Sequence, residues 1–259
     1  MNIKKLLTIA GSDSSGGAGI QADIKTFSAH KVYGMSVITA VTAQNTTGVK
    51  SVYELPVEMI RNQMESVFTD MPPDAIKTGM LSNPEIIECI SEGLLRHKGS
   101  NLVVDPVMVS TSGHRLLSED ALSALKDHLF PLARVITPNI YEAEILSGGK
   151  ISNKKDMVDA AMEISNKLDG WVVIKGGHLK ECCDDLLYSK DEKLWLKARK
   201  INNKNTHGTG CTLSSAIASN LALGIGVKKS VFKAKRYVNS AIREGLDLGE
   251  GRGPLLHHF

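Results

Sequence analysis

Short apolar segments alternate with helical patterns along the whole chain, and this alternation most constrains its fold. Segments rich in branched apolar residues lie at 6–10, 35–43, 75–77, 102–105, 135–137 and 171–175. Helical spacing, such as Ile60, Met64 and Phe68 four residues apart, appears between them. It predicts helices over 20–30, 57–68, 84–98, 118–130, 140–146, 155–168, 210–223 and 227–246. Repeated strand–helix–strand order predicts a mostly parallel sheet covered on both faces. Residues 186–188 and 193–198 are expected to form a small antiparallel pair.

Length and composition fit a single domain over residues 1–259. Of the 259 residues, 42% are hydrophobic and 23% are charged, and the sequence shows no internal repeat or clear linker. The net charge of +3 does not by itself indicate a nucleic-acid partner. No apolar run approaches the ~20 residues that a membrane helix needs. The four cysteines form no CxxC pair, so we expect reduced thiols in a cytoplasmic protein.

The predicted strands end in polar, glycine-rich segments. These segments contain GSDSSGGAG at 11–19, QN at 44–45, GM at 79–80, DPVM at 105–108, TPN at 137–139 and KGGH at 175–178. A further segment, THGTGC at 206–211, precedes a predicted helix. Ligands of open α/β sheets bind beyond the carboxyl ends of the strands. The sequence therefore predicts one convergent ligand site at that edge.

A phosphate-binding segment is expected at 206–210. The first glycine loop lacks the GK[ST] of a Walker A motif, and the strand ending at Gln44 offers no acid for a ribose. Two glycines at 206–210 let the backbone approach an anion closely, and the following helix directs free N–H groups towards it. A plain glycine turn before a buried helix is an equal alternative at this point.

Acidic and basic side chains near these strand ends suggest a metal–phosphate site. Asp105 and Glu142 are candidate Mg²⁺ ligands, since magnesium often uses one or two carboxylates and keeps several waters. Glu142 lies three residues after Asn139, so capping of the helix is the alternative for Glu142. Lys175 ends a buried strand, where an unpaired ammonium is costly. Either a phosphate or a structural carboxylate would provide its partner.

Cys211 follows the predicted cradle at a helix N-terminus near His207. Such a setting is expected to lower the pKa of a thiol, which makes it a candidate base or nucleophile. The alternative is a small buried residue without a chemical role, the commoner fate of a free cysteine.

These segments together resemble the bacterial hydroxymethylpyrimidine/phosphomethylpyrimidine kinases of the ribokinase superfamily. The resemblance runs in order through nearly the whole chain and ends less tightly at GRGPLLHHF (251–259). The matching stretches are TIAGSDSSGGAGIQADIKTF (8–27), SVITAVTAQNTTGV (36–49), KTGML (77–81), VVDPVM (103–108), ITPNIYEAEIL (136–146), VIKGGH (173–178) and NTHGTGCTLSSAIA (205–218). The resemblance implies an α/β fold, a ribokinase-like three-layer α/β/α sandwich with a mostly parallel central sheet and a small antiparallel pair.

The resemblance also implies roles for individual residues. The pyrimidine pocket would be lined by Asp23, Gln44 and Met80, with Gly11 and Val107 nearby. ATP and Mg²⁺ would be held by Asn139, Glu142 and Asp105, with Lys175 on the phosphates and Thr206, Gly208, Thr209 and Gly210 as the anion hole. The catalytic set would be Cys211, Lys175, Gly208 and Gly210. Cys211 stands where the wider superfamily usually has an aspartate base, which leaves the identity of the base open.

The implied activity is phosphorylation of 4-amino-5-hydroxymethyl-2-methylpyrimidine and then of its monophosphate, in thiamin biosynthesis. A cytoplasmic homodimer is the family expectation, with small-molecule substrates and neither nucleic acid nor membrane as partner. Pyridoxal kinase is the alternative, because relatives with the same cysteine motif phosphorylate pyridoxal. A non-catalytic vitamin-binding protein is the alternative from another class, although it would not need residues that hold metal and ATP.

Overall fold

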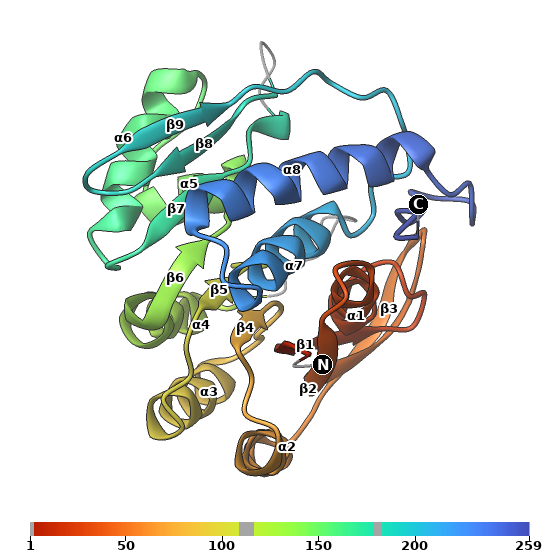
Figure 1. The fold of residues 1–259 in the computed structure, drawn as a ribbon, viewed down its shortest axis with the longest axis vertical. Coiled ribbons are helices and arrows are strands. Elements are labelled where there is room, and N and C mark those ends of the chain that lie inside the picture. Colours follow the sequence, from red (N-terminus) through yellow and green to blue (C-terminus); the bar gives the residue numbers. More distant parts are fainter. Residues whose placement is uncertain (1–2, 109–116, 179–182, 259) are drawn as a thin grey trace.

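One nine-stranded sheet forms the centre of the described part of the molecule, which comprises residues 3–108, 117–178 and 183–258 of a computed structural model. The strand order is β3-β2-β1-β4-β5-β6-β7-β8-β9, and helices lie on both faces (Figure 1). The strands are β1 (Lys5–Asp13), β2 (Tyr33–Asn45), β3 (Gly48–Glu54), β4 (Ala75–Thr78), β5 (Leu102–Val104), β6 (Ala133–Ile136), β7 (Trp171–Ile174), β8 (Asp185–Tyr188) and β9 (Lys193–Leu196). The sheet confirms the predicted α/β class.

The sheet is parallel from β2 through β7 and antiparallel at both ends. The predicted antiparallel pair appears as β8 and β9, and β8 also runs antiparallel to β7. Strand β3 pairs antiparallel with β2 and was not predicted. Its residues are exposed or half-buried, so it lacks the continuous apolar run by which buried strands are recognised.

Helices cover the two faces in separate groups. One face packs against α2 (Val57–Asp70), α3 (Pro84–Arg96), α4 (Glu119–Ala124), α5 (Ile140–Ser147) and α6 (Lys154–Ser165), and the other against α1 (Gly19–Ala29), α7 (Thr209–Ala222) and α8 (Val227–Glu244) (Figure 1). Successive strand residues alternate between the two cores: Leu7 packs on the first face and Leu6 on the second. Two buried faces explain why the central strands are apolar throughout.

Local signals set the helix ends. Asn83 caps α3 with Pro84 at the first helical position, and Asn139 with Glu142 forms a capping box at α5. The helix predicted over 118–130 is shorter than expected. Helix α4 ends at Ala124, and a π turn (Leu125–Leu129) and a 3₁₀ turn (Phe130–Leu132) follow. Pro131 has no N–H to continue an α-helix, which accounts for the end of the helical segment.

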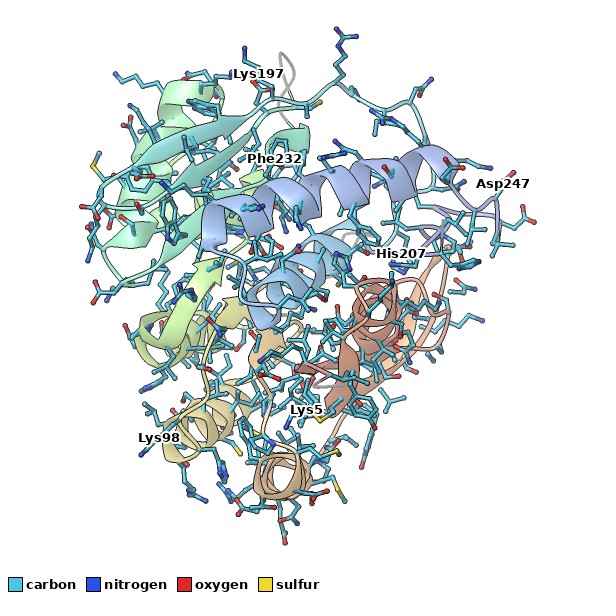
Figure 2. All side chains as sticks on the ribbon, in the orientation of Figure 1. Lys5, Lys98, Lys197, His207, Phe232 and Asp247 are labelled. Atoms are coloured by element: carbon cyan, nitrogen blue, oxygen red, sulfur yellow. The ribbon has the colours of Figure 1, made fainter. Side chains whose placement is uncertain are left out.

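The outer surface carries most of the charged side chains, including Lys98, Lys197 and Asp247 in Figure 2. Within the described residues, none of the helices combines the length and apolar character needed to cross a bilayer. Cys89, Cys183 and Cys211 are not in disulfides, in agreement with the expectation of reduced thiols for these three. Cys182 lies outside the described residues.

Candidate active site

The predicted phosphate-site residues meet at the carboxyl ends of β5 and β7. Lys175 Nζ lies 3.1 Å from Asp105 Oδ1 and 3.8 Å from Glu142 Oε2. The side chains of Asp105 and Glu142 are 2% and 6% exposed, whereas that of Lys175 is 16% exposed. Asn139 connects the elements, because its backbone forms a parallel bridge with Lys175 and its side chain caps α5. The structure thus brings together four residues from three separate parts of the sequence, near positions 105, 140 and 175.

Glu142 combines the capping role with the charged cluster. Its Oε2 accepts the Asn139 N–H at 2.7 Å, while the Asn139 side chain accepts the Glu142 N–H at 3.0 Å. Burial raises the pKa of Glu142 to about 7, because it outweighs the opposing effect of Lys175, and Asp105 raises it further. Burial disfavours the charge of Lys175, but Asp105 and Glu142 outweigh it and raise the pKa of Lys175. The cluster holds one ammonium and two carboxyl groups, so one of the carboxyl groups lacks a cation of its own.

The predicted anion cradle lies beside this cluster. Gly208 has φ 80°, and a Cβ there would collide with the carbonyl oxygen of Gly17, so only glycine fits. The N-cap residue of α7, Gly208, has no side chain to cap the helix, and Thr209 N–H donates to the Thr206 carbonyl at 3.3 Å, so the N–H groups of Gly210 and Cys211 are the ones that could bind an anion. A Cβ added to Gly210 would lie 3.4 Å from Lys175 Nζ. Because the Gly210 backbone lies so close to Lys175, the strand ends and the N-terminus of α7 form one site.

Cys211 lies in the first turn of α7, and its thiol accepts the Gly19 N–H. The expectation of a lowered thiol pKa is wrong for the free protein. Burial raises the pKa of Cys211 to about 11, and the nearby ammonium of Lys77 offsets only part of that effect. The helix N-terminus was visible in the sequence, but the desolvation of the thiol of this half-buried residue was not.

Lys77 and Asp23 form a second ion pair whose side chains are both 0% exposed. Asp23 Oδ1 accepts from Lys77 Nζ at 3.0 Å and Ser215 at 2.6 Å, and Oδ2 accepts from Lys77 Nζ at 2.8 Å and Thr8 at 2.6 Å. Burial opposes the ammonium, yet Asp23 outweighs it and raises the pKa of Lys77. Asp23 was expected to line the pyrimidine pocket. In this structure its carboxylate is fully buried and both oxygens accept hydrogen bonds from the protein, so its pocket role stays a prediction.

The other predicted substrate residues gather beyond β1, β2 and β4. A Cβ on Gly11 would lie 2.7 Å from the Met80 methyl carbon, so the two residues are in contact. Gln44 lies at the end of β2, where its side-chain nitrogen is 3.3 Å from His207 Nε2. Val107 lies half-buried in the turn after Asp105. His207 connects Gln44 to the cradle segment, so substrate and phosphate residues share one edge of the sheet.

The carboxylates of Asp105 and Glu142 fit a magnesium ion. Asp105 Oδ1 accepts from Lys175 and Thr137, whereas Oδ2 accepts only a long bond of 3.4 Å, from Ser214, among the residues that the structure describes. Among the described residues there is no cluster of three or more metal-binding side chains. Two hard oxygen donors next to an anion cradle suit Mg²⁺, which keeps several waters, and do not suit a caged structural metal.

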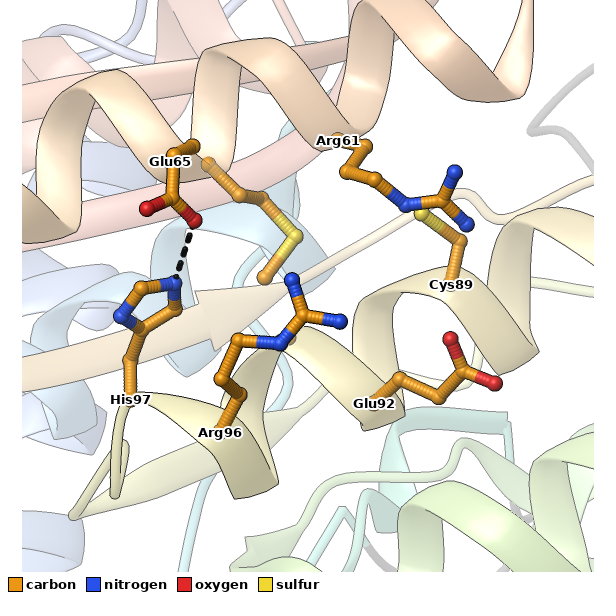
Figure 3. Close-up of a pocket in the computed structure, with 8 residues that line it drawn as sticks. Arg61, Glu65, Cys89, Glu92, Arg96 and His97 are labelled. Atoms are coloured by element: carbon orange, nitrogen blue, oxygen red, sulfur yellow. Dashed lines mark hydrogen bonds and ion pairs between the residues drawn. The ribbon is translucent and has the colours of Figure 1, made fainter.

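A small hollow lies far from this edge, between α2 and α3. It is lined by Arg61, Glu65, Cys89, Glu92, Arg96 and His97, and Figure 3 shows the contact of 2.9 Å between His97 and Glu65. None of these residues belongs to the predicted site. Both arginines are exposed, and the hollow lacks a buried polar group directed into it, so its chemistry is that of a solvated helix–helix groove.

Comparisons with known proteins point to one group of kinases. A family model described as phosphomethylpyrimidine kinase matches residues 13–256. A hydroxymethylpyrimidine/phosphomethylpyrimidine kinase of Rhizobium meliloti is 50% identical over 257 residues, covering 98% of this chain and 96% of the relative. A crystal structure of phosphomethylpyrimidine kinase from Clostridium difficile is 51% identical, with a TM-score of 0.84 over 92% of this chain and 99% of that one. An ADP complex of Bacillus subtilis pyridoxal kinase is 40% identical, with a TM-score of 0.92 over 99% and 98%.

Proposed function

The chain belongs to the phosphomethylpyrimidine kinase family, and from this premise we propose that it phosphorylates 4-amino-5-hydroxymethyl-2-methylpyrimidine and then its monophosphate, using ATP and Mg²⁺. The relatives of this name are kinases, so the chain is a phosphotransferase of a ribokinase-like fold. The observation that carries the proposal is the position of Lys175, which pairs with Asp105 and lies beside Gly210 at the open N-terminus of α7.

Each residue then has a role that follows from its chemistry. Lys175 and the backbone of Thr206, Gly208, Thr209 and Gly210 would bind the phosphates, since an ammonium and free N–H groups both stabilise a developing negative charge. Asp105 and Glu142 would hold Mg²⁺, with Asn139 fixing the position of Glu142. When bound, Mg²⁺ neutralises phosphate charge. Gly11, Gln44, Met80 and Val107 would bind the pyrimidine.

The reaction forms a bond between the substrate hydroxymethyl oxygen and the γ-phosphorus and breaks the bond to the β–γ bridging oxygen, which leaves with ADP. The hydroxyl proton passes to a base, and Cys211 is the proposed acceptor. With a pKa of about 11 the thiol is mostly protonated in the free protein. Positioning and charge neutralisation therefore carry most of the rate, as is usual in phosphoryl transfer.

Pyridoxal is the second candidate substrate, because a pyridoxal kinase has a very similar fold. The relatives at 50% and 51% identity bear the pyrimidine-kinase name, whereas the pyridoxal kinase is 40% identical, so the pyrimidine is favoured. A coupled ADP-release assay with the pyrimidine alcohol, its monophosphate and pyridoxal tests the assignment. We expect the highest kcat/KM for the two pyrimidines. A higher kcat/KM for pyridoxal would reject the proposal, and binding without turnover would favour the vitamin-binding alternative.

We further propose that residues 1–259 form a single catalytic domain, that the protein acts in the cytoplasm and that it assembles as a homodimer. The continuous sheet supports the single domain. The dimer rests on the family resemblance alone. Light scattering of the purified protein tests it: a mass of twice the 28.0 kDa chain is expected, and a mass of one chain would contradict it.

A further inference from the structure

His207 is held between two segments that are remote in the sequence. Its backbone N–H donates to the Gly253 carbonyl at 3.1 Å, and its backbone forms a parallel bridge with Pro254. A Cβ added to Gly17 would collide with the His207 ring. The residue is only 6% exposed and lies beside the C-terminal segment in Figure 2. The imidazole therefore has a fixed position next to Gln44.

The proton on His207 Nε2 follows from its contact with Asp13. His207 Nε2 lies 2.9 Å from Asp13 Oδ2, and the Asp13 carboxylate also accepts N–H bonds from Ser15, Gly17 and Ala18. Burial opposes the charge, but the bonds from His207 and Ser15 outweigh it and hold the pKa of Asp13 well below its usual range. Two acceptors do not bond to each other, so His207 Nε2 must carry a hydrogen in either the neutral or the charged ring.

That hydrogen fixes the orientation of the Gln44 side-chain amide. The Nε2 hydrogen is directed to Asp13, and a protonated Nε2 has no lone pair to accept from an amide nitrogen 3.3 Å away, so the end of the amide that fits there is the oxygen, as a second, longer acceptor of the same hydrogen. The other end lies 3.2 Å from Thr42 Oγ1, whose single hydrogen is directed to the Ser12 carbonyl at 3.0 Å. Thr42 must then accept from the amide nitrogen. Two independent proton counts give one orientation, with oxygen towards His207 and nitrogen towards Thr42.

We propose that His207 is a specificity-determining positioning residue that, with Asp13 and Thr42, holds the Gln44 amide in one orientation so that it reads the order of donor and acceptor on the substrate ring. The inference rests on the proposed function for the identity of that ring. In this orientation one N–H and one lone pair of the amide remain for a ligand. An aminopyrimidine edge offers an amino donor beside a ring-nitrogen acceptor, and the matching pyrimidinone reverses that order.

A freely rotating amide would accept both rings, whereas a fixed amide rejects one of them. The test compares kcat/KM for the aminopyrimidine alcohol and for the corresponding pyrimidinone alcohol, in the wild type and in His207→Phe, which keeps a planar aromatic ring and removes both ring nitrogens. We expect the amino-over-oxo ratio to fall about tenfold in His207→Phe, the size of one lost hydrogen bond. The change should appear in the KM of the pyrimidine, with kcat and the KM of ATP nearly unaltered.

Matched variants separate this role from a structural one. His97→Phe removes a histidine from the α2–α3 groove and should leave the ratio unchanged, while Thr42→Val removes the acceptor at the other end of the amide and should lower it. A His207→Phe protein that folds normally and keeps the wild-type ratio would overturn the proposal. A raised KM for ATP without a change in the ratio would also overturn it, because His207 would then shape the phosphate cradle only.

A nitrogen NMR measurement on the wild-type protein tests the orientation without any turnover. Long-range proton–nitrogen spectra should show His207 Nε2 with the shift of a protonated imidazole nitrogen across neutral pH. A bare Nε2 would overturn the inference even if the protein is a pyrimidine kinase. If Nε2 is protonated but neither pyrimidine is a substrate, the proposed function fails while the geometry of the Asp13–His207–Gln44 network stands.

Discussion

Two buried lysine–aspartate pairs lie in the same sheet, and they differ in how completely their charges are satisfied. Lys77 and Asp23 are both fully buried, and each Asp23 oxygen accepts two hydrogen bonds. One ammonium faces one carboxylate, so the pair is neutral. Such a sealed pair leaves nothing for a ligand to bind, and its role is to join α1, β4 and α7.

The Lys175–Asp105 pair is open and carries an additional acid. Lys175 keeps 16% of its side chain accessible, Glu142 lies 3.8 Å from its ammonium, and the free helix N-terminus of α7 is adjacent. Access and an excess of carboxyl groups distinguish a site that can bind metal and phosphate from an ion pair that only supports the fold. Burial alone does not separate the two, because Asp105 is nearly as buried as Asp23.

The largest effect is expected at Cys211, which is influenced by both lysines. Cys211→Ala should lower kcat by about 10²–10⁴-fold if the Cys211 thiolate accepts the hydroxyl proton, and leave ATP binding intact. Cys211→Asp should then recover part of the rate, because it restores an acid. Steady-state kinetics and calorimetric ATP titration check this. A near-normal kcat in the alanine variant would remove the base role and leave phosphate positioning to carry the reaction.

Breaking the sealed pair should mainly cost stability. Lys77→Met leaves the Asp23 carboxylate buried without its ammonium, and we expect the free energy of unfolding to fall by about 3–5 kcal/mol. Urea denaturation measures the loss. The double variant Lys77→Met/Asp23→Leu removes both charges and should recover much of it. If Lys77→Met unfolds at the wild-type midpoint, the distinction between the two pairs is lost.

Substitutions in the open cluster of Lys175, Asp105 and Glu142 should change the magnesium requirement and leave the resistance to denaturant nearly unchanged. In Asp105→Asn and in Glu142→Gln, the Mg²⁺ concentration for half-maximal rate should rise on the order of tenfold, because a ligand of the ion is weakened. Asp169→Asn changes an exposed carboxylate and serves as the control. Unchanged magnesium dependence in both variants would take these residues out of the metal site. Unfolding of Glu142→Gln would instead favour the capping role alone.

The smallest effect is a pH dependence of stability in the metal-free protein. Glu142 has a pKa of about 7 in the fold and 4.5 as its ordinary value, so the folded state binds its proton more tightly. Its contribution is therefore fully present below about pH 4.5 and is lost as pH rises through 7. Chemical denaturation of the wild type and of Glu142→Gln between pH 5 and pH 8 isolates the effect. The free energy of unfolding should fall with rising pH in the wild type, and the variant should lack this slope. An identical slope in both proteins would contradict the assignment.

The sequence predicted the elements that are buried on two faces and the polar segments at their ends. It missed β3, because the exposed residues 48–54 give no apolar run. It also missed Lys77 as a buried cation, although a lysine within the apolar segment AIKTGM was a visible signal. The sequence did not reveal the burial of Asp23 against Lys77 or the raised pKa of Cys211. Burial and pairing depend on neighbours in space and not on neighbours in sequence. The network of Asp13 and Gln44 through His207 joins residues nearly 200 positions apart, which no local pattern reveals.

The most direct test of the comparison is the dissociation constant of MgATP for Lys175→Met beside that for Lys77→Met, measured by calorimetry on folded protein. Loss of a charged hydrogen bond costs about 1.5–3 kcal/mol, so Lys175→Met should bind MgATP at least about tenfold more weakly. Glu142 can remain protonated and limit the cost to folding in that variant. Lys77→Met should bind MgATP as the wild type does. Wild-type affinity in Lys175→Met, or a greater loss in Lys77→Met, would contradict the assignment of the open pair as the phosphate site.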